Sequence, residues 1–419
     1  MASAIAEFYK VKNVFVTGAT GFLGKVLVEK LLRSCPEVEG IYLLIRPRGD
    51  QTAQERLNKI VESKLFDKVR HEQPTFHRKL HAIPGDMCEP ALGIRQSDQD
   101  MLVSKIHILF HSAATVRLED PLRTSMQLNV IGTRDVIALC HKLKHLQAFV
   151  HVSTAYANCD RSYIEETIYP PPVQPQKLID ALEWMDDTMV TKLTPDLIGK
   201  RPNTYTFTKA CAEYLLTQEA ADLPLSIVRP SIIGGSWREP LAIGKGLLRT
   251  MRGEYNASVD VVPVDLPANL MIAAAWDTAV SRPENIPVYN STSGGVNPLR
   301  WGEFSEGTLV TYKKYPLDKP FRAPNFAFVS NRVLKMYSRL EKDVSSIEYF
   351  TSRHWEWSHG NADALMAKMG EEDKKIFKFD CRGLHWPTYM ENYVLGIKKY
   401  VLKEDMDQRQ IASTSEQGD

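Results

Sequence analysis

The sequence predicts an α/β fold in which a doubly wound parallel sheet is joined to a smaller, mainly helical C-terminal domain. Short apolar runs alternate with stretches of helical period through the first half of the chain, and a glycine-rich turn directly follows the first run. Strands that are apolar along their whole length are typical of a parallel sheet covered by helices on both faces. The last part of the chain is aromatic and has a mainly helical pattern.

Six apolar runs are the predicted strands of the sheet. They are residues 14–16, 41–45, 81–84, 106–110, 148–152 and 225–228. Apolar residues at helical spacing follow the first run at 23–31, and predicted helices recur near 54–65, 122–141 and 205–219. Strands and helices therefore alternate as in a sheet built from strand–helix–strand units.

The chain is predicted to divide into four parts. Residues 1–280 form the sheet domain, which is interrupted at 157–202 by a proline-rich, acidic insertion expected on the substrate side. Proline and glycine cluster after Trp276, so 281–344 is predicted to be a linker with part of the substrate region. The helical domain is expected at 345–406 and a disordered polar tail at 407–419.

Composition excludes several classes of protein. The 419 residues include 52 Lys and Arg against 51 Asp and Glu, so nucleic acid is not the expected partner. Six scattered cysteines favour free thiols in a reducing compartment, and His141 with His145 is better explained as a solvated helix end than as a metal site. The most uniformly apolar stretch, Leu270–Trp276, is far shorter than the ~20 residues of a membrane-spanning helix. We expect no secretory signal and no metal.

The glycine-rich turn predicts a nucleotide site. It lies between a strand and a helix, and its glycines recur at three-residue intervals. Glycine permits the tight turn and lets the backbone approach a pyrophosphate, which then lies at the helix N-terminus. A turn without a ligand is the alternative, but the strand–turn–helix context favours dinucleotide binding. The predicted cofactor-binding residues are Thr17, Gly18, Thr20, Gly21, Phe22, Leu23 and Gly24.

The end of the second strand predicts which nicotinamide cofactor binds. An NAD site has an acidic residue there for the ribose 2′-hydroxyl, whereas this chain has Arg46 and Arg48. Guanidinium groups suit a 2′-phosphate because they form bidentate, charge-assisted hydrogen bonds. NADPH is therefore the expected cofactor, with a pair of ordinary surface arginines as the alternative. Asp86 is a candidate for binding the adenine amino group and equally for a simple turn aspartate.

Tyr205 and Lys209 are the predicted catalytic pair. They are four residues apart and share one face of a predicted helix. The reference pKa of tyrosine is about 10, so we expect the Lys209 cation to lower the pKa of Tyr205 and also to hold the nicotinamide ribose. A hydroxyl at Ser153 or Thr154, after the strand at 148–152, can orient a substrate carbonyl beside Tyr205, with a cap at the strand end as the alternative.

This combination resembles the extended short-chain dehydrogenase/reductase superfamily, which has a Rossmann-type sheet. Supporting motifs are His111–Ala114 after the fourth strand and Arg229-Pro230 after the sixth. The resemblance implies that Thr154, rather than Ser153, takes the catalytic hydroxyl role and that Ala113 lines the cofactor. It also implies that Asn129 supports Lys209 through water.

A narrower resemblance covers about residues 8–406, which are similar to the alcohol-forming fatty acyl-CoA reductases. The motifs that carry it are 17–25, 113–117, 151–156, 169–172, 182–187, 201–209 and 228–231, with Asp380, Arg382, Leu384, Trp386, Tyr389, Asn392, Tyr393, Gly396 and 398–400 in the C-terminal part. The resemblance implies reduction of a long-chain fatty acyl-CoA to a primary alcohol by two hydride transfers from NADPH, with release of CoA. It further implies supply of wax and ether-lipid precursors and a place at the peroxisomal membrane, with the cytosol as the alternative.

The sequence departs from this family's pattern at three places. A Pro/Gly/Trp-rich stretch is missing after 236–240, a partly apolar stretch between Asn331 and Ser345 is abbreviated, and hydrophobic membrane segments do not follow Met406. The first departure concerns the acyl pocket and the other two concern membrane attachment. Two alternatives are kept: an extended reductase or epimerase acting on another carbonyl substrate, and a catalytically impaired NADPH-binding protein. Whether the product is aldehyde or alcohol, and the oligomeric state, are left open.

Overall fold

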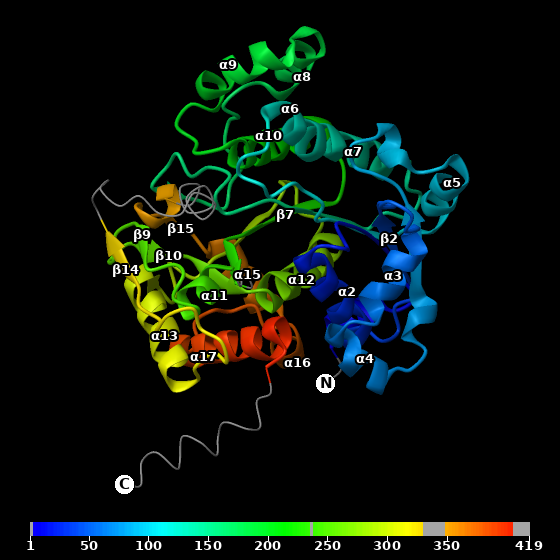
Figure 1. The fold of residues 1–419 in the computed structure, drawn as a ribbon. Coiled ribbons are helices and arrows are strands. Elements are labelled where there is room, and N and C mark those ends of the chain that lie inside the picture. The colour runs from blue at the N-terminus through cyan, green and yellow to red at the C-terminus, as the bar shows by residue number, and fades with distance from the viewer. Residues whose placement is uncertain (1–2, 235–237, 330–347, 405–419) are drawn as a thin grey trace, which may run out of the picture. The chain divides into compact units, whose positions relative to one another are not determined.

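A seven-stranded parallel sheet forms the centre of the larger part of the chain in this computed structural model (Figure 1). Its strand order is β12-β7-β5-β4-β1-β2-β3. The strands β1 to β3 follow one another toward one edge of the sheet, and β4, β5, β7 and β12 follow one another toward the other edge. The strands are β1 (Asn13–Thr17), β2 (Gly40–Ile45), β3 (Leu80–Pro84), β4 (Ile108–His111), β5 (Ala148–Val152), β7 (Leu225–Pro230) and β12 (Val288–Ser291). The predicted fold class and all six predicted strands are therefore confirmed.

The structure describes residues 3–234, 238–329 and 348–404, which divide into two units. Unit 1 consists of Met1–Ile232, Val262–Gly295 and Glu356–Asp380, and unit 2 of Ile233–Val261, Val296–Trp355 and Cys381–Asp419. Each unit thus combines stretches that are far apart in the sequence. The segment predicted as a linker, 281–344, contributes β12 to the sheet, and part of the predicted helical domain belongs to unit 1. The predicted tail lies outside the described residues.

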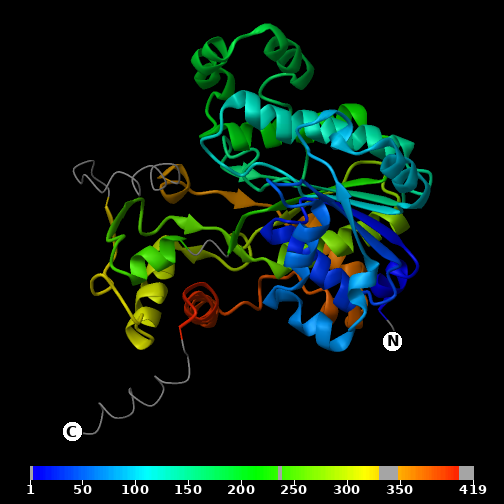
Figure 2. The same ribbon diagram turned by 45° about the vertical axis from the view of Figure 1, so that its right-hand side comes forward.

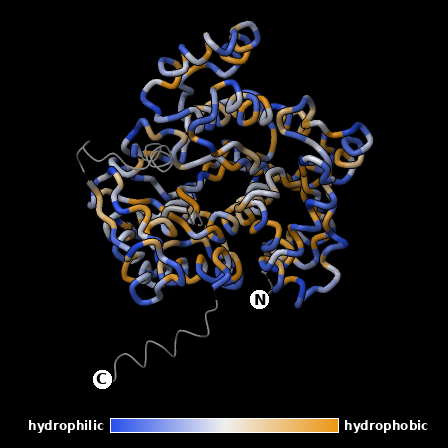
Figure 3. Tube along the Cα trace, in the orientation of Figure 1, coloured by the Kyte–Doolittle hydropathy of each residue, from blue (hydrophilic) through white to orange (hydrophobic). Residues whose placement is uncertain are grey.

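Helices cover both faces of the sheet in unit 1 (Figure 2). On one face, α2 (Phe22–Ser34) packs against α12 (Asp265–Ser281), and on the other lie α7 (Gly132–Lys142) and α10 (Thr204–Glu219). β1, β2, β4, β5 and β7 are buried along their whole length, because side chains on both faces of the sheet pack under helices. Hydrophobic and hydrophilic residues alternate along most helices in Figure 3, as expected for helices with one buried face.

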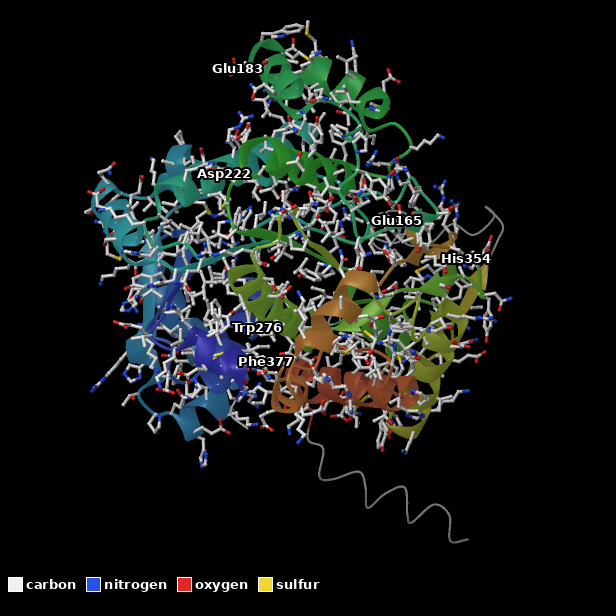
Figure 4. All side chains as sticks on the ribbon, turned by 180° about the vertical axis from the view of Figure 1, so that it is seen from behind. Glu165, Glu183, Asp222, Trp276, His354 and Phe377 are labelled. Atoms are coloured by element: carbon white, nitrogen blue, oxygen red, sulfur yellow. The ribbon has the colours of Figure 1, made fainter. Side chains whose placement is uncertain are left out.

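The remaining elements of unit 1 are short, and the insertion at 157–202 forms two helices that project beyond α10 (Figure 1). Glu183 marks this helical pair in Figure 4. The elements are α1 (Ala4–Tyr9), α3 (Ala53–Val61), α4 (Asp67–Glu72), α5 (Gln96–Lys105), α6 (Leu122–Met126), β6 (Tyr163–Ile164), α8 (Pro175–Trp184), α9 (Asp187–Ile198), β15 (Glu356–Trp357), α15 (Gly360–Lys368) and α16 (Glu371–Ile376).

Unit 2 is mainly helical, with small two-stranded sheets. Its helix α13 packs against α11 and α17, and Tyr312, Leu317 and Val394 form one of its cores. The elements are α11 (Arg238–Gly244), β9 (Thr250–Arg252), β10 (Ser258–Val259), β13 (Leu299–Arg300), α13 (Trp301–Lys314), β14 (Ala327–Val329) and α17 (Trp386–Gly396), while β8 (Ile232–Gly234) and β11 (Val261–Pro263) lie at the unit boundaries. Within the described residues, no helix combines the length and the hydropathy needed to cross a bilayer.

Candidate active site

The glycine turn between β1 and α2 has a backbone that only glycine tolerates. Gly18 has φ +76°, and a Cβ there would lie 2.6 Å from the backbone nitrogen of Ala113. A Cβ on Gly24 would lie 2.3 Å from the carbonyl oxygen of Gly18. Gly21 is the N-cap of α2 and offers no side-chain acceptor to the first turn. The first N–H groups of α2 are therefore left for an anionic ligand such as a pyrophosphate.

The predicted turn residues divide between the surface and the interior. Gly18, Thr20, Gly21 and Phe22 are at least partly exposed, whereas Thr17, Leu23 and Gly24 are buried. The Thr17 hydroxyl lies 2.7 Å from Nδ1 of His111 and accepts a hydrogen bond from the Ala113 backbone N–H at 3.3 Å. Thr17 thus joins the ends of β1 and β4, and its side chain is wholly buried.

Three arginines gather beyond the end of β2. Arg46 and Arg48 are exposed there, as predicted, and the guanidinium of Arg56 in α3 donates a hydrogen bond to the Arg46 carbonyl oxygen. Partial burial, and then the charges of Arg46 and Arg48, lower the pKa of Arg56, as expected where cations crowd together. Arg56 was missed in the sequence, although it lies in the helix predicted to follow these arginines.

Asp86 has the contact expected of a turn aspartate, and its predicted contact with adenine stays a prediction. Its Oδ1 accepts a hydrogen bond from the Cys88 backbone N–H at 3.1 Å, which is the role of a turn aspartate. Its Oδ2 lies 3.5 Å from Nη1 of Arg46. Because β2 and β3 are neighbours, Asp86 and Arg46 come together at the same edge of the sheet.

Thr154, Tyr205 and Lys209 come together near the carboxyl end of β5. The Thr154 hydroxyl lies close enough to the Tyr205 phenol to lower its pKa, and it also donates to the Pro230 carbonyl oxygen at 3.4 Å. Nζ of Lys209 donates to the Val152 carbonyl oxygen at 2.6 Å. Asn203 caps α10 by accepting the Thr206 backbone N–H at 2.9 Å, so the helix begins just before Tyr205. Thr154, rather than Ser153, is the hydroxyl that reaches the tyrosine.

Burial dominates the pKa values of this group. It raises the pKa of Tyr205 to about 12, with the Thr154 hydrogen bond opposing the shift. It lowers the pKa of Lys209 to about 8, with the Glu213 carboxylate opposing the shift. The expected lowering of the Tyr205 pKa by Lys209 is therefore not seen, because loss of solvent around the phenol has the larger effect. Tyr205 stays protonated near neutral pH, which is the form that donates a proton.

Asn129 lies in a π-helical turn, η4 (Gln127–Ile131), between α6 and α7. Its side-chain Nδ2 donates to the Thr208 hydroxyl at 3.0 Å, and its Oδ1 accepts the Thr115 backbone N–H at 2.9 Å. Thr208 is the residue before Lys209. Asn129 thus braces α10 directly beside the lysine, and single π-helical turns of this kind are frequent at functional sites.

Two buried features near the site were not assigned a role in the sequence. Arg229 and Glu213 form a bidentate ion pair at 2.8 and 2.7 Å, with both side chains almost wholly buried. His111 and His151, on neighbouring strands, lie with ring centroids 5.1 Å apart behind Lys209. A charged or imidazole side chain inside an apolar strand was the available signal for both.

The weaker sequence candidates do not form a site. Nε2 of His141 lies 2.8 Å from the Glu219 carbonyl oxygen, whereas the ring of His145 stacks on that of His107. Burial raises the pKa of the Cys211 thiol to about 12, which argues against a nucleophilic thiolate.

Known proteins resemble the chain along nearly its whole length. Residues 16–271 and 323–404 match two families, both described as male sterility protein. Fatty acyl-CoA reductase 1 of Xenopus laevis is 48% identical over 448 aligned positions, which cover 96% of this chain and 87% of that protein. The human fatty acyl-CoA reductases 1 and 2 are 47% and 44% identical with the same coverage. Because 448 positions exceed the 419 residues of the chain, the relative carries internal residues without a counterpart here.

Solved structures support the fold. The reductase domain of a nonribosomal peptide synthetase from Mycobacterium tuberculosis has a TM-score of 0.62 at 20% identity, covering 94% of this chain and 93% of that chain. The terminal R domain from the myxalamid pathway has a TM-score of 0.61 at 17% identity with the same coverage. The chain therefore belongs to the fatty acyl-CoA reductase family and is an oxidoreductase with a nicotinamide-cofactor-binding domain.

Proposed function

We propose that this protein reduces a long-chain fatty acyl-CoA to a primary alcohol in two NADPH-dependent steps and releases CoA. The observation that carries the proposal is the grouping of the Thr154 and Tyr205 hydroxyls with Lys209 near the end of β5, in a chain that belongs to this family. NADPH supplies the hydride in each step. The Thr154 and Tyr205 hydroxyls bind the carbonyl oxygen, and Tyr205 donates its proton to the oxyanion that develops there.

The chain's own residues fit a nicotinamide dinucleotide. The α2 N-terminus, reached through Gly18 and Gly21, would bind the pyrophosphate, and Lys209 would bind the nicotinamide ribose. Thr154 lies two residues after the end of β5 and Tyr205 is the second residue of α10, so both hydroxyls are held at the ends of regular elements. A proton donor held this way needs little reorganisation during the reaction.

The preference for NADPH over NADH is proposed from the arginines after β2. Arg46, Arg48 and Arg56 concentrate three positive charges where the adenosine ribose lies in this class of fold. We expect Arg46→Ser and Arg56→Ala each to raise the KM for NADPH about tenfold, the loss of one charge-assisted contact, and to leave the KM for NADH nearly unchanged. Arg95→Ala, which removes an exposed arginine that pairs with Asp98, is the matched control. Equal losses with both cofactors would contradict the assignment.

The decisive assay combines the protein, NADPH and palmitoyl-CoA and identifies the products by chromatography. We expect the alcohol and free CoA, with two NADPH consumed per substrate. Tyr205→Phe is the control, since it removes the proton donor and keeps the ring that packs in the site. NADPH oxidation no faster than in Tyr205→Phe would refute the proposal. Aldehyde as the final product would restrict the protein to the first step.

Two further outcomes separate the alternatives. Tight NADPH binding without consumption of acyl-CoA would indicate a catalytically impaired protein. The internal residues that the relative has and this chain lacks are the reason for testing this alternative. Turnover of a nucleotide sugar or sterol in place of acyl-CoA would indicate a different extended reductase. The peroxisomal location stays a prediction from the family resemblance, to be tested by imaging the tagged full chain.

A further inference from the structure

The buried side of Lys209 faces a histidine of the central sheet. Nζ of Lys209 lies 2.6 Å from the Val152 carbonyl oxygen and 3.5 Å from Nε2 of His151, the residue before Val152 in β5. His151 is wholly buried, and Lys209 is only 2% exposed. An ammonium group has three N–H donors, and β5 thus presents acceptors to two of them.

His111 is not available as a third acceptor. Its Nδ1 lies 2.7 Å from the Thr17 hydroxyl and its Nε2 lies 3.0 Å from the Thr133 hydroxyl. The Thr133 hydroxyl donates to the Asn129 carbonyl oxygen at 2.8 Å, so it accepts from Nε2–H of His111. Both ring nitrogens of His111 are therefore used, and its ring is neutral because burial lowers its pKa to about 3.

His151 is in the opposite situation. Its Nδ1 is buried without a hydrogen-bond partner among the described residues, and its Nε2 lies 3.5 Å from the Lys209 ammonium. A neutral ring that carries its hydrogen on Nδ1 leaves the Nε2 lone pair free to accept from the ammonium. Burial and the charge of Lys209 both lower the pKa of His151, which keeps this ring neutral.

Among the residues that the structure describes, no unpaired carboxylate competes with His151 for the lysine. The charged and titratable groups around Lys209 are Tyr205 and Glu213 on α10, His151 on β5 and His111 on β4. Glu213 is already bound by both nitrogens of the Arg229 fork, from β7. The ammonium therefore depends on neutral acceptors, and the imidazole is the one that a side-chain substitution can remove.

We propose that His151 is a positioning residue for the reaction, whose Nε2 accepts a hydrogen bond from the Lys209 ammonium. With the Val152 carbonyl and His151 taking two N–H groups, the third is left for the nicotinamide ribose. The inference rests on the proposed role of Lys209 in holding that ribose. It assigns to a residue of the sheet interior the task of fixing the orientation and charge of a residue that contacts the cofactor.

The test compares His151→Leu, which removes the acceptor, with His151→Gln, whose side-chain oxygen reaches about as far as Nε2. NADPH affinity is measured by fluorescence titration over roughly two pH units on either side of 8, a readout that does not require acyl-CoA turnover. We expect His151→Leu to weaken NADPH binding about tenfold, the loss of one hydrogen bond to a charged group. We also expect it to move the loss of affinity at high pH down by about one unit, and His151→Gln to restore most of both.

The contrary results are equally specific. If His151→Leu and His151→Gln lower the melting temperature alike and leave the pH at which affinity is lost where it is in the unaltered protein, His151 is only a core residue and the proposal fails. If His151→Leu does not fold, His151→Asn, whose side chain ends short of the ammonium, replaces it. Absence of alcohol formation in the unaltered protein, with these binding differences intact, would refute the proposed function and leave this inference standing.

Discussion

Arg229 is the largest fully buried side chain of the described residues, and its position explains why a charge is tolerated inside β7. Besides the bidentate pair with Glu213, Nη1 donates to the Glu165 carbonyl oxygen at 3.0 Å and Nη2 to that of Thr167 at 2.7 Å. A buried ion pair is tolerated when hydrogen bonds satisfy its remaining donors. The same guanidinium thus ties α10, which carries Tyr205 and Lys209, to the chain after β6; Glu165 is labelled in Figure 4.

Removing one partner of this pair is therefore expected to be costly. We predict that Glu213→Gln lowers the free energy of unfolding by about 3–5 kcal/mol, because it leaves Arg229 charged and buried without its counter-ion. Urea unfolding followed by tryptophan fluorescence measures the loss. Glu219→Gln, which weakens a partly exposed pair with Arg134 at the end of the same helix, is the control, with an expected loss below about 1 kcal/mol. Equal losses in the two variants would show that the buried pair adds little.

A second prediction at this scale concerns pH. Burial holds the pKa of Lys209 near 8, so its ammonium is fully charged below that pH and is lost as pH rises through it. Activity that needs the charged lysine should therefore fall on the alkaline side with a midpoint near 8 in kcat/KM, which reports the free enzyme. Because the pKa of Tyr205 is about 12, its deprotonation cannot cause that fall. A fall first seen above pH 10 would contradict the structure.

At the scale of elements, the turn from β1 to α2 leaves no room for side chains at two of its glycines. We predict that Gly24→Ala reduces NADPH affinity at least about tenfold and destabilises the fold by about 1–3 kcal/mol, because a methyl group there meets the Gly18 carbonyl oxygen. Alanine favours a helix over glycine by about 1 kcal/mol, so a loss cannot come from helix propensity. Gly360→Ala, at the start of α15 with open space around it, is the control. An unaffected Gly24→Ala variant would disprove the close approach.

Some elements could be predicted from the sequence pattern and others could not. β1 and β2 were predictable because full burial demands continuous apolar runs. β12 was not predicted because it has only four residues, two of them polar. It is recognised as a strand by its pairing with β7. In the site, too, local pattern was sufficient for some residues and not for others. Tyr205 and Lys209 were visible through helical spacing, whereas the contact of Arg56 with Arg46 depends on the path of α3.

Two other site residues were hidden for a different reason. The side chain of Thr17 belongs to a recognisable turn, but which way it points depends on strand pairing with β4, which local pattern does not encode. His151 lies in a strand that is otherwise apolar, where an imidazole is indistinguishable from a core residue until Lys209 is seen beside it.

At the scale of the whole molecule, the start of the described chain is held by residues more than 350 positions later. The Asp373 carboxylate accepts hydrogen bonds from the Ser3 hydroxyl at 2.5 Å and from the Ile5 backbone N–H at 3.2 Å. Just beyond, the Lys30 ammonium lies 5.3 Å above the ring of Phe377, which Figure 4 labels. Unit 1 therefore depends on its last stretch, Glu356–Asp380, to anchor α1 and α2.

We predict that Asp373→Ala frees the N-terminal helix. Loss of a carboxylate that binds the first N–H groups of α1 should cost about 1–2 kcal/mol and speed hydrogen exchange in residues 4–9, measured by mass spectrometry. Glu371→Ala is the control, because it removes an exposed carboxylate from α16, the helix that also contains Asp373. Unchanged exchange in the Asp373 variant would show that α1 is held by its apolar contacts alone.

Because unit 1 combines stretches that are far apart in the sequence, its sheet is completed late during synthesis on the ribosome. Thr154, Tyr205 and Lys209 are all synthesised before β7 is complete, but β12, which covers the outer edge of β7, begins 58 residues after β7 ends. At about 5–20 residues per second the edge waits for roughly 3–12 s. An unpaired apolar strand edge invites pairing with other chains. We expect the nascent protein to need a chaperone in that interval, after its catalytic residues have been synthesised and before β12 pairs with β7.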